Sequence, residues 1–140
     1  MNAESKMTPS ILIADDHNIM RKTLRQWLAT KFPNLRVIEA NSGEQALERL
    51  RDNEFHLVLM DIHLPGINGI TTTTRIKNEF PNLPVIVLTV QEDERYQFEA
   101  TQAGADAYVI KRKMYADLVP LMLSFLGGET LLQSAAGARK

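Results

Sequence analysis

The chain has 140 residues, no cysteine and a formal net charge of −1 at pH 7. These values exclude disulfides, thiolate zinc sites and cysteine nucleophiles, and no basic excess favours nucleic acid or an anionic membrane surface. The length fits one domain with its own hydrophobic core.

Neither the start of the chain nor its apolar runs predict contact with a membrane. The first ten residues, MNAESKMTPS, contain no apolar stretch of the kind that a secretory signal needs. The longest apolar runs are too short to span a bilayer. Because the absence of cysteine also suits a reducing compartment, we expect a cytoplasmic protein.

Five short apolar runs are rich in Val, Ile and Leu and do not alternate with polar residues. This pattern is typical of strands that are buried on both faces. The predicted strands are Ile11–Ala14, Val37–Ile38 with its neighbours, Leu57–Met60, Val85–Leu88 and Ala107–Ile110.

Longer segments with helical spacing separate these runs. In the first, the side chains predicted to share one face are Ile19, Met20, Leu24, Trp27 and Leu28. In the second, after turn residues at 41–43, they are Ala46, Leu47 and Leu50. The third and fourth helices cover roughly 67–80 and 92–103, and the fifth carries Leu118, Leu121, Met122, Phe125 and Leu126.

Glycine and proline mark the ends of two of these segments. Gly104 follows the fourth helix, as a C-terminal cap does. Pro120 lies inside the fifth helical pattern, so it either places the helix start near residue 119 or kinks the helix. After Gly127 and Gly128 the residues are polar and small, which is typical of a linker or a frayed end.

Strand and helix alternate five times, which predicts an α/β domain with a parallel sheet and helices on both faces. The C-terminal ends of such strands share one edge of the sheet, where ligands bind. Polar side chains stand directly at these ends, namely Asp15 and Asp16, Asp61, Thr89 and Lys111. We therefore expect three carboxylates, one hydroxyl and one ammonium group in one crevice.

These five side chains predict a cation and a phosphoryl group. Carboxylates that converge within about 4 Å repel by about 4 kcal/mol per pair at an effective dielectric of 20, so they take up protons or bind a cation. Oxygen ligands with few carboxylates favour Mg²⁺. One oxygen of Asp61 then remains free as a nucleophile, while Lys111 and Thr89 can hold a phosphoryl group. The predicted chemistry is phosphoryl transfer onto Asp61, giving an acyl phosphate.

Over about residues 9–127 the chain resembles the receiver domain of bacterial two-component response regulators. Four stretches carry the resemblance: ILIADDHNIMRKTL, LVLMDIHLPGINGI, PVIVLTV and AGADAYVIK. The resemblance implies a flavodoxin-like (βα)5 three-layer sandwich with a five-stranded parallel sheet in the order 2-1-3-4-5. Tails at 1–8 and 128–140 would flank this domain, the second as a linker stub.

The resemblance also implies a role for each acid. Asp61 would accept a phosphoryl group from a histidine kinase, and the domain would be a signalling switch without substrate turnover of its own. Asp16, Asp61 and the backbone carbonyl of His63 would bind Mg²⁺ or Mn²⁺, with Asp15 acting largely through water.

Other residues match positions that hold or transmit the phosphoryl group in the family. Thr89 and Lys111 would hold it, and Tyr108 would be the switch aromatic that rotates when Thr89 moves. We expect His63 and Gln91 to tune the lifetime of the acyl phosphate, by blocking or orienting the attacking water.

One departure from the family concerns the residue after the lysine. Family members often have a proline there, in a cis peptide, whereas this sequence has Arg112. The geometry of the turn that holds Lys111 therefore stays open. His17, after the acid pair, is expected at the start of a helix with its ring facing solvent.

Two other functions stay open. A flavin- or nucleotide-binding flavodoxin-like protein would need a phosphate-binding loop after the first strand, where DDHN repels a phosphate. A pseudo-receiver would have this fold and never take a phosphoryl group. The stretches DDH and FLGGETLL resemble the subgroup with a C-terminal helix-turn-helix, which implies transcription regulation, and homodimerisation on activation is an analogy to the family.

Overall fold

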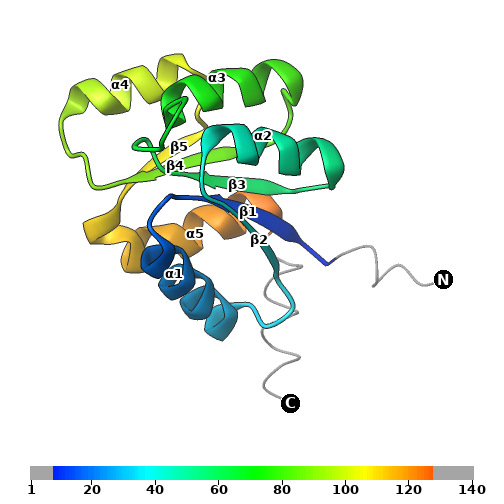
Figure 1. The fold of residues 1–140 in the computed structure, drawn as a ribbon. Helices are drawn as coiled ribbons and strands as arrows, with labels where there is room; N and C mark the ends of the chain where they lie inside the picture. The colour runs from blue at the N-terminus through cyan, green and yellow to red at the C-terminus, as the bar shows by residue number, and fades with distance from the viewer. Residues whose placement is uncertain (1–7, 128–140) are drawn as a thin grey trace.

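In the computed structural model, which describes residues 8–127, strands and helices alternate along the chain (Figure 1). The elements are β1 (Ser10–Ala14), α1 (Asn18–Lys31), β2 (Arg36–Ala40), α2 (Gly43–Asp52), β3 (Leu57–Met60), α3 (Gly69–Glu79), β4 (Val85–Thr89), α4 (Glu94–Gln102), β5 (Ala107–Ile110) and α5 (Met114–Leu126). Residues 128–140, predicted as a linker or frayed end, lie outside the described residues.

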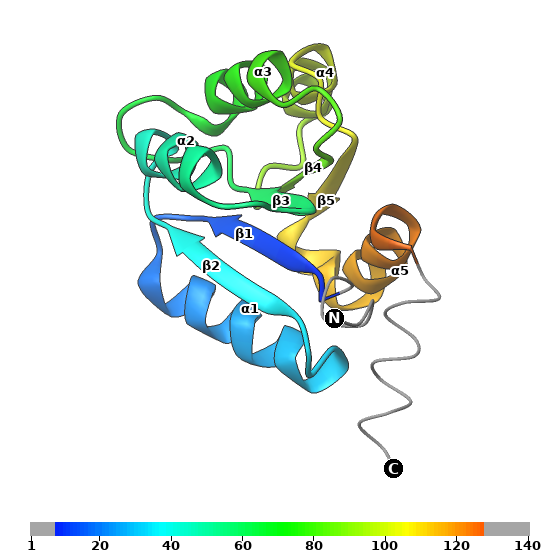
Figure 2. The same cartoon turned by 90° about the vertical axis from the view of Figure 1, so that its right-hand side faces the viewer.

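The strands form one parallel sheet in the order β2-β1-β3-β4-β5. Figure 2 shows α1 and α5 on one face of this sheet and α2, α3 and α4 on the other. The predicted flavodoxin-like sandwich is therefore confirmed. The central strands β1, β3 and β4 are buried along their whole length, whereas the edge strands β2 and β5 are only partly buried because each has one neighbour.

Successive residues of β1 face the two halves of the core. Ile11 and Ile13 pack with α1 and α5, while Leu12 and Ala14 pack with α2 and α3. This alternation holds the sheet between its helix layers and fixes the direction in which β1 delivers the residues after Ala14.

The predicted apolar helix faces are largely those that the structure buries. In α2, Ala46, Leu47 and Leu50 are buried as predicted. In α1 the prediction for Ile19 is wrong, since this side chain is 81% exposed while Leu28 is fully buried. At about 100° per residue, Ile19 lies roughly opposite Leu28 on the helix, so it cannot share its buried face.

The two predicted breakers differ in their outcome. Gly104, at φ +102°, follows α4 in a conformation that favours glycine, which confirms its role as a helix terminator. Pro120 lies inside α5, which begins at Met114, so a helix start near residue 119 is wrong. Because the side chain of Met114 is buried in the core, the first turn of α5 is stabilised ahead of the proline.

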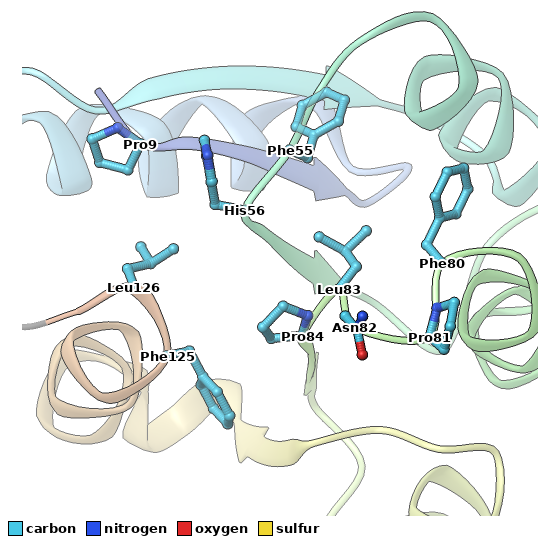
Figure 3. A pocket seen from close by; sticks show the side chains of 10 residues that line it. All are labelled: Pro9, Phe55, His56, Phe80, Pro81, Asn82, Leu83, Pro84, Phe125 and Leu126. Atoms are coloured by element: carbon cyan, nitrogen blue, oxygen red, sulfur yellow. The ribbon is translucent and has the colours of Figure 1, made fainter. Parts of the chain in front are cut away.

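An apolar pocket of about 660 Å³ lies at the end of the sheet where the strands begin, opposite the end that carries the acids (Figure 3). Its lining comes from the segments before β1, β3 and β4 and from the end of α5, including Pro9, Phe55, Leu83, Pro84 and Phe125. It contains none of the acids that follow β1 and β3. Within residues 8–127, no helix combines the length and the apolar character that crossing a membrane requires.

Candidate functional site

The acids after β1 and β3 lie together at the C-terminal edge of the sheet. Ala14 is paired with Met60 in the parallel register, so Asp15 and Asp61 leave neighbouring strands at the same level. One ligand atom from each of Asp15, Asp16, His17 and Asp61 lies within 4.8 Å of the others. The structure thus brings together the three carboxylates that sequence reasoning placed in one crevice.

Asp61 is a buried carboxylate, with a side chain that is 4% exposed. Its Oδ1 accepts a hydrogen bond from the His63 amide at 3.4 Å, and its Oδ2 lies 3.6 Å from the Nζ of Lys111. Burial raises the pKa of Asp61 above its ordinary value, and the charge of Lys111 opposes this shift. The ionised form is therefore costly, and the lysine offsets only part of that cost.

Lys111 lies between two acids and is nearer to Asp15. Its Nζ is 2.8 Å from Asp15 Oδ2, and the side chains of Lys111 and Asp15 are 9% and 5% exposed. Asp15 also accepts a hydrogen bond from the His17 amide through Oδ1 at 2.8 Å. Both Asp15 oxygens thus have partners at 2.8 Å, whereas the two Asp61 oxygens have only the longer contacts, at 3.4 Å with the His63 amide and 3.6 Å with Lys111 Nζ.

Asp16 and His17 form the exposed side of the cluster. The His17 side chain is 69% exposed, as expected for a ring facing solvent, but its Nδ1 also lies 3.2 Å from Asp16 Oδ1 and 3.3 Å from Asp15 Oδ1. Sequence reasoning missed this contact. The only sequence signal for it was that His17 directly follows the two acids.

The donor atoms of this cluster fit a hard divalent cation. Three carboxylates supply oxygen, which Mg²⁺ and Mn²⁺ prefer. The His17 ring adds a nitrogen that would favour a transition metal only if it replaced an oxygen ligand. Burial of Asp15 and Asp61 beside each other makes a bound cation electrostatically favourable.

Thr89 and Gln91 lie at the end of β4, next to the Asp61 strand. Thr89 is fully buried, and its Oγ1 accepts a hydrogen bond from the Gln91 amide at 3.2 Å. The Gln91 side chain reaches the loop after β3, where its Nε2 lies 2.7 Å from His63 Nε2. The two residues predicted to tune the acyl phosphate are therefore in direct contact, which no sequence pattern indicated.

Tyr108 on β5 contacts the loop that follows β4. Its hydroxyl donates a hydrogen bond to the Gln91 carbonyl at 2.7 Å, and burial raises its pKa. Gln91 thus contacts three of the predicted site residues. Its backbone amide bonds to Thr89, its backbone carbonyl to Tyr108 and its side chain to His63.

The turn after β5 shows how Lys111 is held without a following proline. Residues Lys111–Lys113 form a 3-10 turn that leads directly into α5. Arg112 forms two hydrogen bonds with Glu92, at 3.0 and 2.7 Å, and so connects this turn to the loop after β4. Sequence reasoning identified the departure at Arg112 but not its partner.

Comparisons with known proteins agree with this fold and site. A family model described as "Response regulator receiver domain" matches residues 11–122. An uncharacterised transcriptional regulatory protein of Bacillus subtilis, YhcZ, is 38% identical over 125 residues, which are 89% of this chain and 58% of that protein. The chain spans less than two thirds of the length of the curated relatives that it matches.

Solved structures give the same result. A LuxR-family two-component response regulator from Aurantimonas is similar with a TM-score of 0.80 and 29% identity, over 94% of this chain and 98% of that one. The response regulator TrrA of Thermotoga maritima, in complex with Mg²⁺-BeF, is similar with a TM-score of 0.75 and 27% identity, over 84% of this chain and 98% of that one.

Proposed function

Because the chain belongs to the family of response regulator receiver domains, we propose that Asp61 accepts a phosphoryl group from a histidine kinase and thereby switches the domain. The observation that carries the proposal is the position of Lys111, whose Nζ contacts the carboxylates of both Asp15 and Asp61. One cation from the fifth strand thus faces the acids of the first and third strands.

The chemistry of the transfer requires a nucleophile and a way to neutralise charge. A carboxylate oxygen of Asp61 forms a bond to phosphorus while the bond from phosphorus to the donor's histidine nitrogen breaks, and its electron pair stays on that nitrogen. Lys111 can neutralise charge on the transferring group, and the Thr89 hydroxyl can donate a hydrogen bond to it. The burial of Asp61 excludes most water from the reacting oxygen.

We assign the metal site to the acids of the same cluster. Asp16, Asp61 and the backbone carbonyl of His63 would hold Mg²⁺ or Mn²⁺, with Asp15 acting largely through water. When bound, the cation offsets negative charge on the acids and on the phosphoryl group. The complex of TrrA with Mg²⁺-BeF supports this assignment by similarity.

The switch would run through the contacts at position 91. If the Thr89 hydroxyl turns toward a phosphoryl group, it loses the hydrogen bond that its oxygen now accepts from the Gln91 amide. The Gln91 carbonyl also accepts a hydrogen bond from the Tyr108 hydroxyl. Movement of the loop after β4 would break this bond and free Tyr108 to rotate. The loop leads into α4, and its displacement would change the partner-binding face near α4 and β5.

The contact between His63 and Gln91 supports a role in dephosphorylation. Their side chains meet at 2.7 Å between the loops that follow β3 and β4. A water that attacks phosphorylated Asp61 would pass near this pair, which would therefore set how long the acyl phosphate lasts.

The role of the whole protein is also a proposal. The names of the relatives favour a regulator of transcription, and one structural neighbour is of the LuxR family. An output domain joined after α5, a cytoplasmic location and homodimerisation on activation fit this reading. The alternative is a pseudo-receiver that binds partners without phosphorylation, which the departure from proline at Arg112 leaves open.

Mass spectrometry of the intact protein tests the proposal. With acetyl phosphate and Mg²⁺, we expect the wild-type chain to gain one phosphoryl group and Asp61→Asn to gain none. Incorporation that survives in Asp61→Asn would show that another residue is the acceptor. A folded wild-type chain that takes up no phosphate, and shows no Mg²⁺-dependent change of Trp27 fluorescence with beryllofluoride, would favour the pseudo-receiver.

A further inference from the structure

One ion pair connects the turn that carries Lys111 to the loop that follows Thr89. Arg112 donates from Nε to Glu92 Oε2 at 3.0 Å and from Nη2 to Glu92 Oε1 at 2.7 Å. We propose, on the basis of the function proposed above, that Arg112 is a positioning residue for phosphoryl transfer. Through its bond to Glu92, Arg112 holds the turn of Lys111 in place relative to residues 90–93. It thereby sets the distance between Lys111 and Thr89, the two side chains that would hold the phosphoryl group.

The two connected segments leave the sheet side by side. Strands β4 and β5 are paired with Thr89 opposite Ile110. The chain after Thr89 enters residues 90–93, and the chain after Ile110 continues directly into Lys111. A contact between Glu92 and Arg112 therefore joins the two loops a few residues beyond the last sheet pair, where no backbone ladder holds them.

The turn itself has few other side-chain contacts. Lys113, at the N-cap position of α5, forms no capping hydrogen bond with its side chain. Lys111 bonds to Asp15, and this contact must weaken when Lys111 turns to a phosphoryl group on Asp61. Within the Lys111–Lys113 turn, Arg112 thus forms the hydrogen bonds that reach outside the reacting cluster and that lower the pKa of the Glu92 carboxyl, while Lys113 acts on Glu92 by its charge alone and adds to this shift.

On the other side of the pair, Glu92 follows the residue that organises the loop. Gln91 contacts Thr89 through its amide and Tyr108 through its carbonyl. A shift of Glu92 therefore moves the backbone that both Thr89 and Tyr108 contact. The Arg112–Glu92 pair therefore acts on both Thr89 and Lys111, which would hold the phosphoryl group. Neither Arg112 nor Glu92 touches Asp61 in the contacts described.

The exposure of the pair sets the expected size of the effect. Arg112 and Glu92 are 61% and 49% exposed, so water and salt screen their attraction. We expect Arg112→Ala to slow phosphorylation of Asp61 about two- to fivefold, the size typical of an exposed ion pair. Arg112→Lys keeps the charge but loses the planar two-bond contact, so its rate should be intermediate.

The experiment measures the rate constant of phosphate incorporation from acetyl phosphate with Mg²⁺, by mass of the intact chain. The variants are Arg112→Ala, Arg112→Lys, Glu92→Gln and the exchanged pair Glu92→Arg with Arg112→Glu. Arg51→Ala is the matched control, because Arg51 forms the same two-bond contact with Glu79, at 2.8 and 2.8 Å, between α2 and α3. Thermal unfolding is measured for every variant.

The positioning role predicts slower incorporation in Arg112→Ala and Glu92→Gln and a smaller difference from wild type in high salt. In the exchanged pair it predicts partial recovery, because the charge of Lys113 also acts at position 92. A purely structural role would lower the unfolding midpoint of Arg112→Ala and Arg51→Ala alike and leave both rates at the wild-type value. Wild-type phosphorylation with an unchanged rate in Arg112→Ala overturns the positioning role alone. A wild-type chain that is not phosphorylated overturns the proposed function and the positioning role together.

Discussion

Replacing Gly69 with alanine should damage the site through the backbone of Asp61. A Cβ on Gly69 would lie under 3.0 Å from the Asp61 carbonyl group and 2.8 Å from the Ile62 Cα. These are backbone atoms, so no side chain can rotate to make room. The start of α3 and the segment after β3 would have to separate by a distance on the order of 1 Å to restore van der Waals contact.

Two effects of opposite sign contribute to the stability of Gly69→Ala. Alanine gains about 0.5–1 kcal/mol over glycine in the middle of a helix, which is an upper bound for Gly69 as the first residue of α3. Overpacking costs about 1–3 kcal/mol. Because the clash involves backbone on both sides, we expect the cost to win, with a net loss of about 1–2 kcal/mol. Urea unfolding followed by Trp27 fluorescence should then show a midpoint lower by roughly 0.5–1 M.

The Gly69→Ala substitution should also slow phosphorylation of Asp61, by more than its loss of stability would explain. A displacement near 1 Å at a reacting group can slow a reaction by about 100-fold, so phosphate incorporation per folded molecule should fall by about 10- to 100-fold. Gly43→Ala is the control, because its Cβ would meet Thr72 and Ile67 rather than Asp61. We expect Gly43→Ala to lose stability and keep its rate. Wild-type stability and rate in Gly69→Ala would refute the tight approach of α3 to Asp61.

Three further predictions concern Asp61, the His63–Gln91 contact and Glu39. Since burial raises the pKa of Asp61, the unfolded chain ionises first, and stability falls as pH rises from the ordinary carboxyl pKa to the raised folded pKa. In metal-free buffer at pH 7, Asp61→Asn should therefore increase the free energy of unfolding, and an unchanged or lower value would contradict this. Replacing His63 and Gln91 together with alanine should change the rate of dephosphorylation after the donor is removed, and an equal rate would refute their role. The hydrogen bond from Arg21 lowers the pKa of Glu39, so this group stabilises the fold above its unfolded pKa near 4.5 and loses that contribution as pH falls through its folded pKa. Glu39→Gln should therefore be less stable than wild type at pH 7, by about 1 kcal/mol, and equal to it near pH 2 in urea titrations, and a gap that persists in acid would argue against the ion pair.

The residue pattern along the chain was enough to predict the parallel sheet and the place of the acids at its C-terminal end. Unbroken Val, Ile and Leu runs require burial on both faces, and strands of this kind separated by helices form a parallel sheet. Since parallel strands end at one edge, residues such as Asp15, Asp61 and Lys111 had to meet there. This conclusion needed only the order of the residues along the chain.

The side-chain pairs around the site could not be predicted in this way. Lys111 bonds to Asp15 more closely than to Asp61, Gln91 meets His63, and Arg112 finds Glu92. Each of these partners is separated from the other by many residues, and the choice depends on differences of about 1 Å between loops. A local pattern sets the period and burial of an element, whereas partner choice depends on how loops from different strands pack after the sheet has formed.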